Sequence, residues 1–130
     1  MIKKYFHFIL LFLLLLLFFG YKQFQAQGIE QINTDQLAEM LESDGQNDVF
    51  YIDVREPHEF QDGHINGMVN VPLSQLENNY DIIPKEKTVV IFCRSGNRSL
   101  QAANILKDIG YKDLVNVKGG ILDWKGEVVK

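Results

Sequence analysis

The sequence predicts an α/β fold, an open and mostly parallel sheet of about five strands with helices on both faces. Three short apolar runs rich in β-branched residues, at residues 49–54, 88–92 and 114–117, are typical of strands buried on both faces of a parallel sheet. Segments with the apolar spacing of helices separate these runs, and strands that alternate with helices form a parallel sheet. The 130 residues suffice for one core and are too few for two ordinary domains.

The first 27 residues are expected to lie outside this fold, which leaves one domain at residues 28–130. They carry three lysines and no acidic residue, and residues 8–19 are an unbroken run of Phe, Ile and Leu. An apolar run of 12 residues behind a basic start is typical of a secretory signal peptide, and it is shorter than the roughly 20 residues that span a bilayer. We therefore predict export to the periplasm or cell envelope.

The fate of this segment stays open at the level of sequence. Signal-peptide cleavage prefers small residues in an A-x-A pattern, which Ala26 satisfies and Phe24 does not. If the apolar run is counted over residues 5–19, an uncleaved membrane anchor is the alternative to a cleaved signal peptide.

The charge of the domain narrows its partners. Of the 13 basic residues, three lie in the first 27, so residues 28–130 have 10 bases against 17 acids and a formal charge of −7. Nucleic-acid binding usually needs a basic face, which argues against such a partner. Neither His58 nor His64 has a second ligand at metal-binding spacing, and nothing in the sequence indicates a metal, nucleotide or flavin cofactor.

The first helix of the domain is expected from residue 33 or 34. Asn33 or Thr34 can cap it, Gln36 is placed to complete a capping box, and residues 37–41 supply an apolar stripe. Residues 45–48 form a polar turn that leads into the strand at 49–54.

The next segment is read as turn, strand and helix. A charged string at residues 55–59 leads into residues 60–66, which contain an Asp-Gly turn. Residues 68–71 form a short strand that Pro72 closes, and the apolar residues up to Tyr80 fit one helix.

Cys93 is the only cysteine in the sequence, and its position points to a reactive thiol. It ends the apolar run 88–92, and a short loop at residues 94–98 separates it from a helix at 99–109, which Gly110 stops. The first N–H groups of a helix lack internal partners, and the peptide dipoles leave positive charge there. An anion is therefore favoured at this position.

A thiol at such a helix start, beside Arg94 and Arg98, favours the nucleophilic thiolate. Gly96 allows the loop to turn so that backbone N–H groups converge on the sulfur. The alternative is an inert, buried cysteine, but a strand end, a glycine turn and a helix start together favour a reactive one. As the single cysteine of an exported chain, Cys93 can form neither an internal disulfide nor a dithiol pair.

After the strand at residues 114–117, Gly119 and Gly120 open a short helix. In open parallel sheets, ligands bind beyond the carboxyl ends of the strands. Because Cys93, Arg55 and Gly119 all fall at the carboxyl ends of predicted strands, we expect them to share one crevice.

Four segments together resemble a single-domain rhodanese. They are DVREPHEF at residues 53–60, GHINGMVNVP at 63–72, CRSGNRS at 93–99 and GGILDW at 119–124. They occur in the order found in that family and cover most of the chain after residue 27. The resemblance implies a rhodanese-like fold and a sulfurtransferase activity. In such a reaction Cys93 takes a sulfane sulfur from a donor such as thiosulfate, holds it as a persulfide and passes it to cyanide or a thiol.

The same resemblance implies the parts of the site. Cys93 is the catalytic residue, and the loop after it binds the small anionic donor, for which the planar fork of arginine is suited. The loop residues expected to bind the donor are Arg94, Ser95, Gly96, Asn97, Arg98 and Ser99.

Mainly structural roles are expected for the residues around the loop. We predict that Asp53 and Arg55 stabilise the crevice edge, that Arg55 pairs with Glu59, and that His64 bonds to backbone in its own turn. We predict that His58 is exposed and that Ile121 and Trp124 lie in the core and at the pocket rim.

Two alternatives come from different classes of protein. A phosphatase or arsenate reductase of the same fold has a similar loop, but one residue longer, with arginine six positions after the cysteine; here Ser99 occupies that position and Arg98 stands at five. The other alternative is a non-enzymatic sulfur carrier or binding module that serves an envelope protein, which repeated turnover with small thiols would distinguish from an enzyme.

Overall fold

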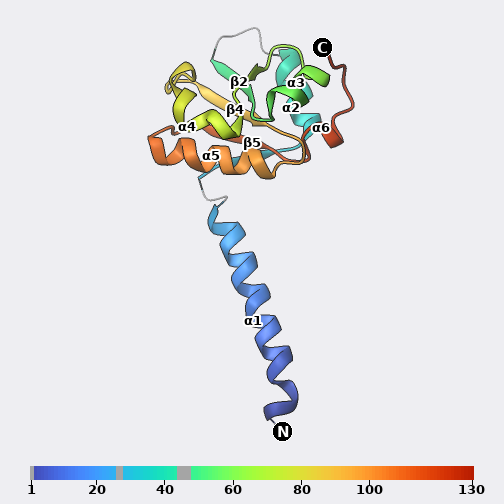
Figure 1. The fold of residues 1–130 in the computed structure, drawn as a ribbon, viewed down its shortest axis with the longest axis vertical. Helices are drawn as coiled ribbons and strands as arrows, with labels where there is room; N and C mark the ends of the chain where they lie inside the picture. Colours follow the sequence, from blue (N-terminus) through green and yellow to red (C-terminus); the bar gives the residue numbers. More distant parts are fainter. Residues whose placement is uncertain (1, 26–27, 44–47) are drawn as a thin grey trace.

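The computed structural model describes residues 2–25, 28–43 and 48–130. It contains a five-stranded sheet, and Figure 1 shows a long helix that leads away from the sheet. All strands are parallel, in the order β1-β5-β4-β2-β3. Their bounds are β1 Glu30–Ile32, β2 Val49–Asp53, β3 Val69–Asn70, β4 Thr88–Phe92 and β5 Leu114–Val117. The predicted fold class is confirmed.

The central strand β4 is buried on both faces, as its β-branched sequence predicts. Val89, Ile91 and Cys93 contribute to the core on one face, whereas Val90 and Phe92 contribute to the core on the other. Side chains alternate across a strand, so helices must cover both sides of such a sheet. Helices α4 (Leu76–Asn79) and α5 (Asn97–Ile109) cover the face that carries Cys93. Helices α2 (Thr34–Ser43) and α6 (Gly120–Asp123) cover the opposite face.

The start of α2 has the predicted capping box. The Asn33 N–H donates to Gln36 Oε1 at 2.9 Å, and the Gln36 N–H donates to Asn33 Oδ1 at 2.8 Å. Leu37 is fully buried beneath this turn. The turn predicted at 45–48 falls largely on residues 44–47, which lie outside the described part of the chain.

Two elements differ from the sequence prediction because they depend on backbone pairing or capping. Strand β1 was not predicted, since Ile32 is its one buried side chain and its pairing with β5 makes it a strand. Helix α3 (Pro57–Asp62) replaces the predicted charged string and turn. It has no buried residue to produce an apolar stripe, and a capping box of Glu56 and Glu59 with Pro57 at its start stabilises it.

The segment that follows β3 is also more broken than predicted. In place of one helix up to Tyr80, the chain forms the 3-10 turn η1 (Leu73–Gln75), the short helix α4 and the 3-10 turn η2 (Tyr80–Ile82). Leu76 is the buried residue of α4, so little apolar contact favours a continuous helix.

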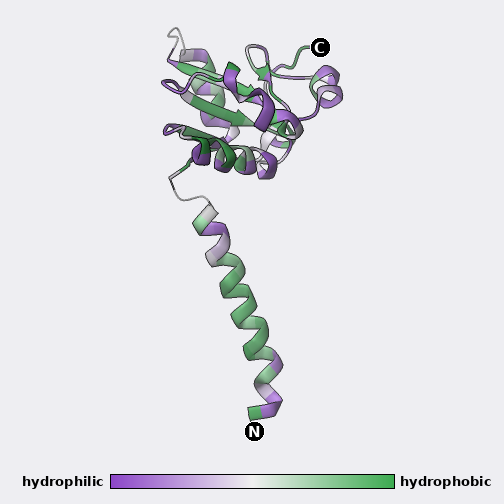
Figure 2. Cartoon of the chain, turned by 60° about the vertical axis from the view of Figure 1, so that its left-hand side comes forward, coloured by the Kyte–Doolittle hydropathy of each residue, from purple (hydrophilic) through white to green (hydrophobic). Residues whose placement is uncertain are grey.

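Helix α1 (Ile2–Gln25) stands apart from the sheet, and Figure 2 shows that most of its length is apolar. Its segment Ile2–Phe24 has 23 residues with a mean hydropathy of 2.1 and is wholly exposed, so by length and composition it can cross a membrane. At a rise of about 1.5 Å per residue it exceeds the roughly 30 Å of a hydrocarbon core. The continuous helix is therefore longer than the 12-residue apolar run on which the sequence prediction relied.

Candidate active site

Cys93 lies at the carboxyl end of β4, directly before the loop that leads into α5, and is fully buried. The Gly96 N–H donates to its Sγ at 3.0 Å. The thiol in turn donates to the Ser99 hydroxyl, with 3.3 Å between Sγ and Oγ, and Ser99 is equally buried. A hydroxyl is both donor and acceptor, so Ser99 can donate to the sulfur once the thiol has lost its proton.

The carbonyl groups of the loop point away from the sulfur. Three of them accept N–H groups from the segment after β5: Ile121 to Cys93 at 3.0 Å, Leu122 to Arg94 at 3.1 Å and Gly119 to Ser95 at 3.2 Å. In a planar trans peptide, the C=O and the following N–H point in opposite directions. The N–H groups of residues 94–96 are therefore turned away from β5 and α6, and that of Gly96 reaches the sulfur.

Gly96 provides the turn that the sequence predicts. Its φ is +102°, in the left-handed region, and it is the residue directly before α5. A Cβ at this position would lie 3.3 Å from both Gly119 N and Lys118 Cα, so the loop is also closely packed against the neighbouring strand end.

The two loop arginines have different surroundings. Arg94 is exposed. Arg98 makes a two-pronged ion pair with Glu59, with Nη1 to Oε1 at 2.7 Å and Nη2 to Oε2 at 2.9 Å. The Arg98 side-chain hydrogen bonds lower the pKa of Glu59 to about 2, and the same contact raises the pKa of Arg98. The Arg98 fork is thus already filled by a carboxylate.

The ion pair predicted between Arg55 and Glu59 is wrong. Arg55 instead pairs with Asp53, with 2.8 Å between Nη2 and Oδ2, and both side chains are buried. Its contact with Glu59 goes to the backbone carbonyl, 3.4 Å from Nη1, and a further bond reaches the Gly63 carbonyl at 2.9 Å. Asp53 lies at the end of β2 and also accepts the Arg55 N–H at 3.0 Å, so this buried pair lies at the carboxyl edge of the sheet.

The accessory residues lie largely where the sequence places them. His64 Nδ1 is 2.8 Å from the Phe60 carbonyl, and its ring stacks on Phe60 with 3.7 Å between centroids. His58 is exposed, and Ile121 and Trp124 are partly buried against the core on the α2 face.

Sequence reasoning did not assign two residues that support the loop. Gly120 has a φ of +52°, and a Cβ there would overlap the carbonyl oxygens of Cys93 and Arg94. Asn116 of β5 is 2% exposed, and its Nδ2 lies 3.5 Å from the Gly96 carbonyl. The glycine pair after a strand end was the available signal for the first, and no pattern in the sequence marks the second.

The fold and the loop define a parallel α/β domain that presents a cysteine at a helix start. Residues 33–127 match the family described as the rhodanese-like domain, and the chain belongs to that family.

Similar curated proteins include sulfurtransferases and a sulfur carrier. The chain is 36% identical over 99 residues to "Putative sulfurtransferase YtwF" of Bacillus subtilis, covering 76% of this chain and 93% of that protein. It is 35% identical over 96 residues to "Sulfurtransferase" of Allochromatium vinosum, covering 74% and 88%. It is 33% identical over 102 residues to "Putative sulfur carrier protein YrkF" of Bacillus subtilis, covering 78% of this chain. The match spans only 54% of YrkF, and 61% of the uncharacterised Bacillus subtilis protein YqhL, which is 44% identical over 77 residues.

Solved structures share the fold of this chain. A rhodanese-related protein of Thermoplasma volcanium has a TM-score of 0.66 at 33% identity, covering 77% of this chain and 97% of that one. A Rhodopseudomonas palustris protein, described as of unknown function and a possible tyrosine phosphatase, has a TM-score of 0.70 at 29% identity, covering 79% and 84%.

Proposed function

We propose that this protein is a sulfurtransferase of the rhodanese type that works through a Cys93 persulfide. The observation that carries the proposal is the position of the sulfur, which ends β4 and faces the Gly96 N–H and the Ser99 hydroxyl at the start of α5. Both groups can donate to a sulfur anion, and the positive end of the helix dipole favours negative charge there. Relatives named as sulfurtransferases support the same activity.

The chemistry proceeds in two displacements. The Cys93 thiolate attacks the outer sulfur of thiosulfate, the sulfur–sulfur bond of the donor breaks, and sulfite leaves with the bonding electron pair. The enzyme then holds the outer sulfur as a persulfide anion. Cyanide or a thiolate attacks that sulfur, thiocyanate or a new persulfide leaves, and the Cys93 thiolate is regenerated. A covalent intermediate of this kind predicts ping-pong kinetics.

The loop residues divide this work between them. We propose that the N–H groups of Ser95, Gly96 and Asn97 hold the transferred sulfur and that exposed Arg94 attracts the anionic donor. Arg98 belongs to the same proposed binding loop, but it is engaged by Glu59 and would have to release that carboxylate to contact a donor.

A sulfur carrier is the second candidate, supported by the likeness to a protein named as one. A carrier would take up one sulfur and release it only to a particular envelope protein, whereas an enzyme would turn over repeatedly with small thiols. A phosphatase is less well supported, although one structural neighbour is described as a possible tyrosine phosphatase. The loop from Cys93 to Arg98 is one residue shorter than the resemblance to such enzymes requires.

The test is an intact mass of the purified, reduced full-length protein before and after thiosulfate, and again after cyanide. We expect a gain of one sulfur atom that cyanide removes as thiocyanate, and no gain in Cys93→Ser, a near-isosteric variant. A wild-type protein that stays folded and gains no sulfur contradicts the proposal and makes a phosphate-ester assay the next step. Sulfur that is taken up but not released to small acceptors favours the carrier.

We further propose that residues 1–27 direct the domain at residues 28–130 out of the cytoplasm and remain as its membrane anchor. The support is the 23-residue exposed apolar helix, the large Phe24 where cleavage prefers a small residue, and the basic start, which favours a cytoplasmic N-terminus. Full-length protein that resists alkaline extraction from membranes of the native host is the expected result. A soluble form that begins near residue 28 would establish a cleaved signal peptide instead.

A further inference from the structure

Backbone N–H groups from another part of the chain hold the loop that follows Cys93. The carbonyls of Cys93, Arg94 and Ser95 each accept an N–H from residues 119–122, at 3.0–3.2 Å. We call residues 119–122 the clamp. Since these bonds account for three consecutive carbonyls, the loop cannot rotate its peptide groups without breaking contacts to the clamp.

One peptide group couples the clamp directly to the sulfur. The Ser95 carbonyl and the Gly96 N–H belong to the same planar unit. The Gly119 N–H bonds to that carbonyl at 3.2 Å on one side, and the Gly96 N–H bonds to Cys93 Sγ at 3.0 Å on the other. A shift of the clamp would therefore tilt the N–H that faces the sulfur.

Glycine at position 120 makes the close approach possible. A Cβ on Gly120 would overlap the carbonyl oxygens of Cys93 and Arg94, the acceptors that the clamp must reach. An alanine there forces the clamp and the loop apart, because backbone atoms lie on the opposing side and no flexible side chain can move away.

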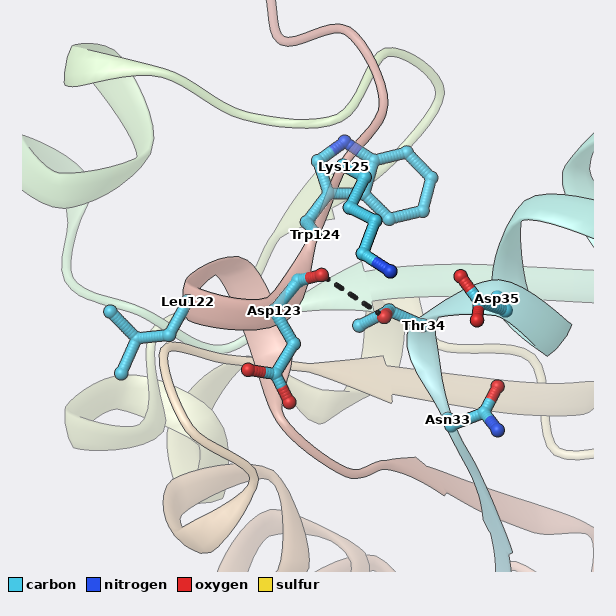
Figure 3. Close-up of a pocket in the computed structure, with 7 residues that line it drawn as sticks. All are labelled: Asn33, Thr34, Asp35, Leu122, Asp123, Trp124 and Lys125. Carbon is cyan, nitrogen blue, oxygen red and sulfur yellow. Dashed lines mark hydrogen bonds between the residues drawn. The ribbon is translucent and has the colours of Figure 1, made fainter.

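Helix α2 also holds α6, the helix that contains most of the clamp. Figure 3 shows the Thr34 hydroxyl of α2 directed at the backbone carbonyl of Asp123, to which it donates with 3.3 Å between the oxygens. Thr34 is 7% exposed and is the first residue of α2, so the start of α2 braces the end of α6. The support thus runs from α2 through α6 to the loop that surrounds the sulfur.

We infer that the clamp is the positioning element of the active site and that Gly120 is a positioning residue, which acts on Cys93 through the loop peptides without touching substrate. The inference rests on the proposed function for its meaning in sulfur transfer. It also makes a claim about the sulfur alone: the clamp holds the Gly96 N–H on the Cys93 sulfur, where it can donate to a sulfur anion, so a loosened clamp makes the sulfur a slower nucleophile.

The test compares Gly120→Ala with Gly67→Ala in the full-length protein. Gly67 also has a positive φ, +94°, but no atom of the described residues lies within 4 Å of a Cβ built there, so this variant carries backbone strain without contact to the loop. For each variant we would measure the melting temperature, the transfer rate and the rate at which iodoacetamide alkylates Cys93.

For Gly120→Ala we expect slower alkylation, and we expect transfer to fall about tenfold or more, as misplaced catalytic groups commonly cause. For Gly67→Ala we expect a lower melting temperature with the wild-type alkylation rate. Equal alkylation rates for the two variants would overturn the inference. Because alkylation needs no sulfur donor, a wild type that takes up no sulfur would refute the proposed function and leave this comparison intact.

If Gly120→Ala fails to fold, the hydrogen bond from Thr34 to the Asp123 carbonyl provides a second test of the clamp. Thr34→Val removes the hydroxyl that bonds to the Asp123 carbonyl and keeps the side-chain volume, whereas Thr34→Ser keeps the hydroxyl. We expect slower alkylation for Thr34→Val as well, by a smaller factor, and the wild-type rate for Thr34→Ser. A Thr34→Val protein with the wild-type alkylation rate would then reject the clamp as a positioning element.

Discussion

The two neighbouring strands β4 and β5 end in the same way, and yet only one of the two ends carries a reactive group. Each is followed by a glycine in the left-handed region that begins a helix, Gly96 with φ +102° before α5 and Gly119 with φ +84° before α6. The N–H groups at the start of α6 are bonded to the loop carbonyls, whereas the Gly96 N–H is bonded to the Cys93 sulfur.

A helix start can therefore bind an anion only when its N–H groups are not already bonded to other groups of the protein. At α6 they are used within the protein, and that use turns the peptide groups before α5 toward the sulfur. A third start, that of α3, is closed by its own capping box, in which the Glu56 and Glu59 side chains take the free N–H groups. Three strand ends at one edge of the sheet thus have three different outcomes.

Gly96→Ala should have the largest effect, because Gly96 precedes α5 and packs against Gly119, which precedes α6. We expect a loss of about 1–3 kcal/mol of unfolding free energy from the strained backbone, with sulfur transfer reduced about a hundredfold through misplacement of the loop. Urea denaturation and the transfer assay measure the two effects. Gly110→Ala is the control, because Gly110 has a similar φ of +113° at the far end of α5; equal transfer rates in both variants would contradict the prediction.

Ser99→Ala tests whether the open helix start needs a side chain in addition to its N–H groups. Loss of a hydrogen bond to a charged sulfur should slow transfer about tenfold and leave the fold intact, since alanine fits a helix. The matched control is Ser43→Ala, at an exposed position of helix α2. A rate that changes as little in Ser99→Ala as in the control would show that Ser99 is only a packing residue.

Glu59→Gln tests the link between the closed start of α3 and the open start of α5. Because Arg98 lowers the pKa of Glu59 from 4.5 to about 2, the carboxylate stabilises the fold above pH 4.5, and this contribution disappears as the pH falls toward 2. We expect the variant to be about 1 kcal/mol less stable at pH 7.

The check is chemical denaturation of wild type and Glu59→Gln at pH 7, 5 and about 3, the interval in which the carboxylate titrates. The difference in unfolding free energy should be constant between the first two values and smaller at the third. Glu39→Gln, at an exposed position of α2, should show no such difference. A difference that grows on acidification would contradict the ion pair.

Arg94→Ala should have the smallest effect, because this exposed side chain acts on the donor only at long range. We expect about a threefold rise in KM for thiosulfate at low salt, little change at high salt, and unchanged stability. Arg94→Lys should keep most of the attraction. A KM that is insensitive to both the substitution and the salt concentration would remove Arg94 from donor binding.

Much of the fold could be predicted from local patterns. The apolar, β-branched run of β4 and the capping box of α2 appear where the sequence indicates them, because burial on both faces and a reciprocal side-chain cap both leave local signatures. Strand β1 and helix α3 do not, since one depends on pairing with β5 and the other lacks an apolar stripe.

The ion pairs show the same limit within the site. Asp53, Arg55, Glu59 and Arg98 all stand out in the sequence, which predicts an ion pair of Arg55 with Glu59 and donor binding by Arg98. Glu59 and Arg98 are 39 residues apart, and only the folding of α3 beside the start of α5 brings them together. Arg55 was thereby left to the buried carboxylate of Asp53.

By itself the sequence determined the parallel α/β fold, the place of Cys93 at a strand end before a helix, and the glycine on which that turn depends, because each follows from periodicity or from the conformational freedom of one residue. Only the tertiary structure decided which N–H groups face the sulfur and which face the loop carbonyls. Hydrogen bonds between the ends of neighbouring strands depend on the packing of segments some 25 residues apart, and no local pattern encodes them.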